Sequence, residues 1–155
     1  MSLKIVNVTP NIETVMIDQA DDQYNLTTTI KFLAKNLQTI PRDYFVLYST
    51  NPALTSELIG DPGQVSRYIS RRATNSDLIV VHDTIQNSNS QRLRYVSKYQ
   101  NITDTNQAVI PREQVNNLAV IVVTARKLQR RKSTSYTVIN MDVLKVLEDG
   151  AAPEN

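Results

Sequence analysis

Strict alternation of apolar and polar residues is the feature that most constrains the fold of this chain. Over residues 24–35, one set of alternate positions holds Tyr24, Leu26, Thr28, Ile30, Phe32 and Ala34, and the other set is mostly polar. Successive side chains of a β-strand point to opposite faces of a sheet, so this segment has one apolar and one polar face. The pattern predicts a half-buried strand of an antiparallel sheet.

β-Branched residues dominate the other apolar stretches, and they pack better on a pleated sheet than on a helix. We expect polar turns at residues 9–11, 18–22 and 87–90, where Pro, Asp, Asn and Ser gather. Between these turns the sequence predicts seven more strands, at residues 3–8, 12–17, 44–50, 77–85, 92–100, 118–125 and 136–143. Eight short strands in 155 residues predict an all-β, single-domain antiparallel β-sandwich of immunoglobulin-like or jelly-roll type.

Two segments carry weaker helical signals. Residues 52–59 fit a single helical turn that ends at Gly60, and residues 64–72 place Val65, Tyr68, Ile69 and Arg72 at helical spacing. A strand is the alternative for the second segment. We expect one sandwich domain over residues 1–147, with its main excursion at residues 126–134, and a flexible polar tail over residues 148–155.

A strongly basic segment lies between two of the predicted strands. The run LAVIVVTA leads into RKLQRRK at residues 126–132, where five of seven residues are cations, and YTVINMDV follows. An apolar strand, a cationic tip and a second strand predict a long, protruding β-hairpin. The residues expected to bind a partner are Arg126, Lys127, Arg130, Arg131 and Lys132 in the tip, with Arg71, Arg72, Arg92 and Arg94 as additions to a basic face.

Three interpretations of the basic tip compete. It can bind an acidic protein surface, it can bind the phosphates of a nucleic acid, or its charge can keep a solvated hairpin end unpaired. The net charge of +2 is too small for a protein that coats nucleic acid. Tyr95 and Tyr99 fall on the opposite face of their predicted strand from Arg92 and Arg94, which weakens an interpretation based on base stacking.

Catalytic motifs are scarce. The chain has no Cys, which excludes thiol nucleophiles, disulfides and thiolate zinc sites, and its three Gly residues form no phosphate-binding loop. The single histidine, His82, precedes Asp83 and could join a Ser-His-Asp arrangement, but no nucleophile-elbow motif is present. We interpret His82 as a strand-end or interface residue and expect a non-enzymatic protein without cofactor or metal.

The carboxylates Asp18, Asp21 and Asp22 are the one cluster that could attract a hard cation. They lack the spacing of a calcium loop and a downstream Glu, so a solvated turn is the favoured interpretation, with calcium binding as the alternative. No stretch reaches 18 uninterrupted apolar residues, and the N-terminal segment lacks the features of a secretory signal. We therefore expect neither membrane insertion nor Sec export, and a cytoplasmic location unless the chain is part of a virion.

In general style the chain resembles small virion proteins of tailed bacteriophages, namely head-decoration, neck or tail-completion subunits. The features behind this resemblance are the β-rich single domain, the Cys-free composition, the strand TSYTVINMDV after RKLQRRKS, and the short polar tail. No diagnostic motif is involved, so the resemblance transfers no functional residue. It implies a structural subunit that contacts copies of itself and other proteins in a symmetric ring or lattice.

Two other functions are alternatives to an assembly subunit. A nucleic-acid-binding module would use the basic tip and would show a steep dependence of affinity on salt. A carbohydrate- or receptor-binding sandwich would place its site in the loops, at residues 18–22 or 87–90.

Overall fold

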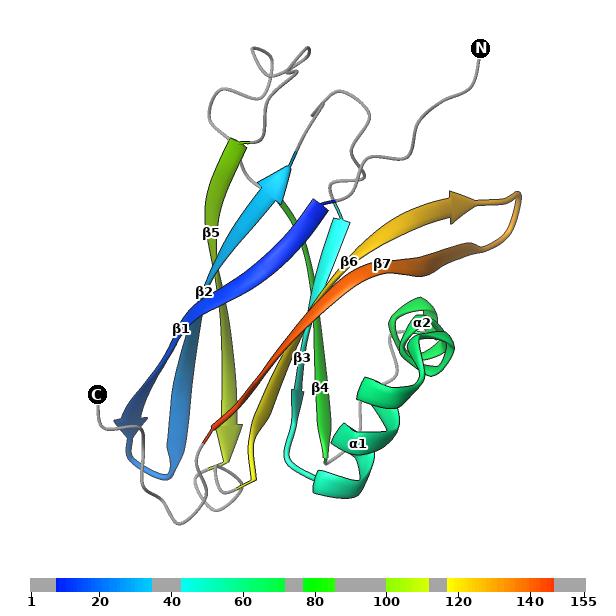
Figure 1. Ribbon diagram of the computed structural model, residues 1–155. Coiled ribbons are helices and arrows are strands. Elements are labelled where there is room, and N and C mark those ends of the chain that lie inside the picture. The colour runs from blue at the N-terminus through cyan, green and yellow to red at the C-terminus, as the bar shows by residue number, and fades with distance from the viewer. Residues whose placement is uncertain (1–7, 35–42, 72–76, 86–99, 112–116, 147–155) are drawn as a thin grey trace.

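The chain folds into two antiparallel β-sheets and a layer of two helices (Figure 1). The computed structural model describes residues 8–34, 43–71, 77–85, 100–111 and 117–146. Sheet A has the order β1-β2-β5 and sheet B the order β4-β3-β6-β7. In chain order, the strands and helices are β1 (Val8–Ala20), β2 (Gln23–Ala34), β3 (Asp43–Ser49), α1 (Pro52–Gly60), α2 (Pro62–Arg71), β4 (Leu78–Thr84), β5 (Gln100–Pro111), β6 (Ala119–Gln129) and β7 (Thr134–Lys145).

The described part is mostly antiparallel β structure, as an all-β sandwich requires. The alternation predicted for β2 is confirmed, because Leu26, Thr28, Ile30 and Phe32 are all buried. The strands expected at residues 12–17 and 136–143 lie within β1 and β7, and those expected at residues 44–50, 77–85 and 118–125 match β3, β4 and β6 except for one residue at one or both ends. Except for Val8 and Gln100, the strands expected at residues 3–8 and 92–100 fall outside the described residues, as does the turn expected at 87–90.

Two predicted turns are wrong: the one at residues 9–11 does not form, and the one at residues 18–22 is shorter than expected. Residues 9–11 are part of β1, which extends from Val8 to Ala20 and pairs with β2 on both sides of a register shift at Glu13. Pro10 is compatible with this because β1 is the outer strand of sheet A. The turn expected at residues 18–22 shrinks to Asp21 and Asp22, with Ala20 paired to Gln23 and Asp21 at a positive φ of 49°.

Strand β5 was not predicted, and its interior side explains why. In register with β2, the positions of Asp104 and Asn106 point into the sandwich, where an apolar residue is expected. Both side chains accept hydrogen bonds from tyrosine hydroxyls of β3: Tyr44 to Asp104 at 2.8 Å and Tyr48 to Asn106 at 3.0 Å. The inner face of β5 is therefore partly polar, which hides the alternation by which a half-buried strand is recognised.

Both helical segments form helices, so the strand alternative for the second segment is wrong over residues 64–71. Helix α1 is longer than the single turn expected, and Asn51 caps it by accepting hydrogen bonds from the backbone N–H groups of Ala53 and Leu54 at 2.9 and 3.3 Å. Helix α2 buries Val65 and Ile69 against sheet B. The two helices thus cover the face of sheet B that sheet A does not cover (Figure 1).

Two hydrophobic cores result from this layering. One lies between the sheets and the other between sheet B and the helices. Strands β3 and β6 serve both cores, because their alternate side chains point in opposite directions: Val46 and Val122 face sheet A, whereas Phe45 and Val123 face the helices.

Candidate interaction surface

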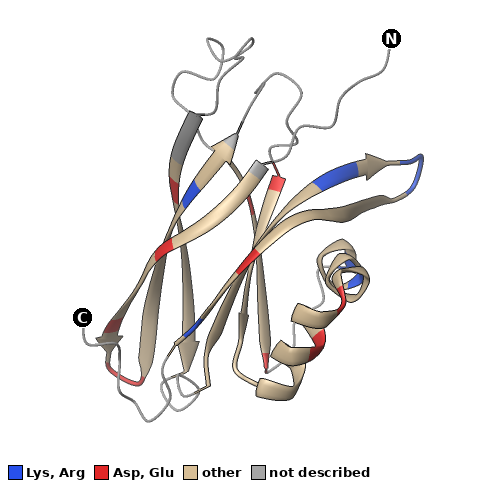
Figure 2. Ribbon diagram, in the orientation of Figure 1, with Lys and Arg blue, Asp and Glu red and all other residues tan. Residues whose placement is uncertain are grey.

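The predicted cationic residues lie where β6 and β7 leave the core. Ala125 is the last buried residue of β6, and every residue from 126 to 132 is exposed. The two strands stay paired as far as Gln129 and Thr134, and the Arg130 N–H donates to the Ser133 carbonyl at 2.8 Å to close the turn. The cations Arg126, Lys127, Arg130, Arg131 and Lys132 are consequently brought together at the far end of this strand pair (Figure 2).

The cations of β6 alternate between the two faces of this strand pair. Lys127 is paired with Tyr136, whose ring belongs to the core beneath the helices, so Lys127 is on the helix side. Arg126 and Leu128 are on the opposite side, and Leu128 is 46% exposed among the cations. The cationic end therefore presents charge on both sides and a large apolar side chain on one of them.

Helix α2 adds two cations beside β7. The Ser70 hydroxyl accepts from the Tyr136 N–H at 2.8 Å and donates to the Tyr136 carbonyl at 3.2 Å, and the Ser66 hydroxyl accepts from the Val138 N–H at 3.1 Å. These serines satisfy backbone groups on the outer edge of β7 and fix the helix against the strand. Arg67 and Arg71, which follow these serines in the sequence, are exposed on the side of α2 away from the buried Val65 and Ile69.

We call Arg67, Arg71, Arg126, Lys127, Arg130, Arg131 and Lys132 the basic surface. Its two parts, residues 62–71 and 124–141, contain these seven cations and no carboxylate. Arg67 was missed by the sequence reasoning, although its spacing of four from Arg71 places both on one helix face; its guanidinium donates to the Gln64 side-chain oxygen. Arg72, Arg92 and Arg94, also predicted to bind a partner, lie outside the described residues.

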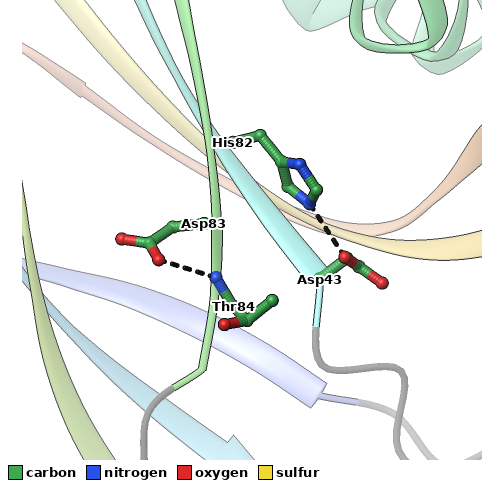
Figure 3. Close-up of polar contacts among 4 residues, drawn as sticks. All are labelled: Asp43, His82, Asp83 and Thr84. Carbon is green, nitrogen blue, oxygen red and sulfur yellow. Dashed lines mark hydrogen bonds and ion pairs between the residues drawn. The ribbon is translucent and has the colours of Figure 1, made fainter.

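The geometry around His82 differs from the arrangement considered for catalysis. The His82 Nε2 atom lies 2.8 Å from the Asp43 Oδ1 atom on the neighbouring strand, whereas Asp83 points the other way and accepts from the Thr84 N–H at 2.8 Å (Figure 3). The suggestion that Asp83 orients the imidazole is therefore wrong, because adjacent residues of β4 face opposite sides of the sheet. The His82 ring stacks on Phe45 with centroids 4.4 Å apart and meets the Tyr136 ring edge-on at 5.4 Å.

Two tyrosine hydroxyls connect the sheets through the interior. Tyr44 donates to Asp104 at 2.8 Å and lies 3.4 Å from an Asp83 oxygen. Burial, and then the two carboxylates, raise the pKa of Tyr44 far above its usual value. Burial raises the pKa of Tyr48 to about 12. The hydroxyls of Tyr48 and Thr28 form a hydrogen bond of 2.9 Å. These hydroxyls stay protonated at neutral pH and serve as fixed hydrogen-bond donors rather than as proton carriers.

The acidic cluster lies away from the basic surface. Asp18, Asp21 and Asp22 are exposed at the turn between β1 and β2. Among the described residues, no group of three or more ligand-type side chains is arranged to hold a metal ion, and no helix is both long and apolar enough to cross a membrane.

Comparison with known proteins identifies no relative. No family model, no curated protein and no solved structure matches this chain.

Proposed function

We propose that this chain is a non-enzymatic assembly subunit, which contacts copies of itself and other proteins of a larger complex through the basic surface and through strand edges. On the basis of the resemblance to small virion proteins, the proposed complex is the head, neck or tail of a tailed bacteriophage. The long protruding hairpin and the immunoglobulin-like or jelly-roll assignment stay predictions within this proposal.

The observation that carries the proposal is the absence of carboxylates from both parts of the basic surface. Ordinary exposed faces mix charges of both signs, whereas seven cations gathered without a counter-charge repel one another. Such a surface is stabilised when a partner of opposite charge covers it, and long-range attraction then speeds the encounter. The serine contacts of α2 with β7 hold the two parts at a fixed spacing, which suits recognition of a shaped partner.

The outer strands of the two sheets provide a second kind of contact. In the described part of the chain, the sheet order places β4 and β5 at the edges away from the β1 and β7 side. An outer strand can extend its sheet by pairing with a strand of another chain.

A protein partner is favoured over a nucleic acid by Leu128. This side chain is 46% exposed in the middle of the cations, and apolar contacts surrounded by charge are typical of protein interfaces. Phosphate binding by the same cations is the second candidate, and it predicts an affinity that falls steeply as salt is added.

A triple substitution tests the proposal. Arg130→Ser, Arg131→Ser and Lys132→Ser together should change the free energy of unfolding by less than about 0.5 kcal/mol, because exposed charges contribute little to stability. The variant should lose self-association or partner binding, measured by light scattering after size exclusion and by pull-down. Lys145→Ser, which removes an exposed cation at the other end of β7, is the matched control and should behave as wild type.

Two results would count against an assembly role. The first is a triple variant that assembles as well as the wild type. The second is a wild-type protein that stays monomeric, binds DNA or RNA, and loses that binding with added salt, which would establish the nucleic-acid candidate instead.

A further inference from the structure

Charge is distributed very unevenly between the two sides of the molecule. Within residues 8–34 and 100–111, which form sheet A and the β1–β2 turn, there are five carboxylates and a single cation, Lys31; one of the five, Asp104, faces the interior and accepts from Tyr44. The basic surface holds seven cations and lies on the other side of the molecule (Figure 2). One copy of the chain therefore carries both members of a complementary pair of charges, too far apart to meet within the same copy.

The outer face of sheet A has no covering layer among the described residues. Both helices pack on sheet B (Figure 1), and the outward residues Met16 and Asp18 of β1 and Gln107 and Val109 of β5 are exposed. The register places Asp18 opposite Asn25 and Asn25 opposite Val109, and the next outward row contains Met16, Thr27 and Gln107. We call Met16, Asp18, Asp22 and Val109 the acidic face, since they lie at or beside the β1–β2 turn.

The acidic face combines carboxylates with apolar side chains. Met16 is 56% exposed and Val109 is 50% exposed, the highest values for large apolar residues in the described part of the chain. The basic surface shows the same combination with the charge reversed, because Leu128 is exposed among cations. Apolar contact at the centre and opposite charges around it are the composition of a protein interface.

We propose that the acidic face of one copy binds the basic end of the β6–β7 strand pair of a second copy. This inference rests on the proposed assembly function and adds the partner surface to it. Because the two surfaces are different, the contact is head-to-tail, and each copy can engage one neighbour with each surface. Repetition of such a contact produces a closed ring or an open filament.

Mixing two deficient variants tests this contact. The first variant carries Arg130→Ser, Arg131→Ser and Lys132→Ser, and the second carries Asp18→Asn and Asp22→Asn; all five positions are exposed. At low ionic strength, sedimentation velocity should show wild-type species larger than a dimer and each variant alone as a 17.5 kDa monomer. An equimolar mixture should form a one-to-one dimer and nothing larger, because only one usable contact is left.

Matched controls use exposed charges outside both surfaces. Glu57→Gln on α1 and Lys145→Ser on β7 should sediment as wild type, and a mixture of these two should show no dimer limit. Circular dichroism of all variants checks that they keep the fold.

Two outcomes would overturn the inference, and they have different consequences for the proposed function. If the wild type assembles but the mixed variants stay monomeric, the head-to-tail contact is wrong and self-assembly through other surfaces stands. If the wild type stays monomeric at low ionic strength, self-association is wrong altogether, and the assembly function then depends on capture of a different protein by the basic surface.

Discussion

The two sheets of this protein are buried to different degrees. Sheet B lies between sheet A and the helices, and the six residues of β3 from Tyr44 to Ser49 are all buried, as are all residues of β6 from Ala119 to Ala125. Sheet A has only one covered face, and in β2 buried positions alternate with partly exposed ones from Leu26 to Phe32. Burial on both faces requires an unbroken apolar run, whereas burial on one face requires alternation.

Because of this difference, the residues that stabilise the fold and the residues available to bind other proteins lie in different parts of the molecule. The residues that hold the fold together are concentrated in sheet B and in the inward half of sheet A. Exposed charge and exposed apolar side chains are concentrated on the outward half of sheet A and at the end of the β6–β7 pair. Substitutions in the first group should lower the free energy of unfolding, and substitutions in the second group should change only the associations of the protein.

Val122→Asp should have the largest effect. Val122 is fully buried between the sheets, and its register partner on β7 is Asp142, so the new carboxylate would be both desolvated and beside a like charge. We expect the free energy of unfolding to fall by more than about 4 kcal/mol, and circular dichroism to show no cooperative thermal transition. A variant that melts near the wild-type temperature would contradict the burial of β6, whereas Val122→Ala should stay folded.

Ile69→Ala tests whether the helix layer belongs to the same cooperative unit as sheet B. Ile69 is fully buried between α2 and the sheet, so its truncation should lower the free energy of unfolding by about 2–4 kcal/mol in a urea titration. Arg67→Ala on the exposed side of α2 is the control and should change stability little. An equally small loss for Ile69→Ala would mean that the helices contribute little to the folded core.

Tyr48→Phe addresses the polar link between the sheets. At neutral pH the loss of the hydrogen bonds with Thr28 and Asn106 should lower the free energy of unfolding by about 1–3 kcal/mol. The pKa of Tyr48 is about 12 in the folded protein, so above pH 10 the unfolded chain ionises first, and stability falls with rising pH until the folded pKa is passed.

The Tyr48→Phe variant lacks this ionisation. Between pH 10 and 12 its free energy of unfolding should therefore fall less steeply than that of the wild type, and the two slopes should differ by about 1.4 kcal/mol per pH unit. Thr28→Val is the control, because it removes a partner of Tyr48 without removing the ionising group. Equal alkaline slopes for wild type and Tyr48→Phe would show that Tyr48 does not resist ionisation in the folded state.

Met16→Ala should have the smallest effect on folding. The side chain is 56% exposed on the outer face of sheet A, and its truncation should change stability by less than about 0.5 kcal/mol in the same urea titration. Under the head-to-tail proposal it should still weaken self-association. A large loss of stability would mean that the outer face of sheet A supports the fold rather than contacts.

The fold could be predicted from sequence wherever a pattern is local. The alternation of β2 and the apolar runs of β3 and β6 follow directly from which faces are buried. Strand β5 could not be recognised, because Asp104 and Asn106 on its inner side are partners of tyrosines that lie far away in the sequence. Pro10 suggested a turn because the sequence does not show that β1 is an outer strand.

The candidate site shows the same division. Five cations fall within seven consecutive residues, 126–132, so the sequence predicts them as one group. Arg67 joins these cations through the packing of α2 against sheet B and the serine contacts with β7, which are tertiary contacts; its spacing of four from Arg71 is a local signal for a shared helix face only. The partner of His82 proved to be Asp43 on a neighbouring strand rather than the adjacent Asp83, for the same reason.

The most direct test of the central claim, that the exposed charges of this chain make contacts between proteins, is the solution mass of the wild type at low and at high ionic strength. Light scattering after size exclusion should give a defined oligomer at low ionic strength, and its mass should fall as salt screens the opposite charges. A 17.5 kDa species under both conditions would contradict self-assembly through the basic surface and the acidic face.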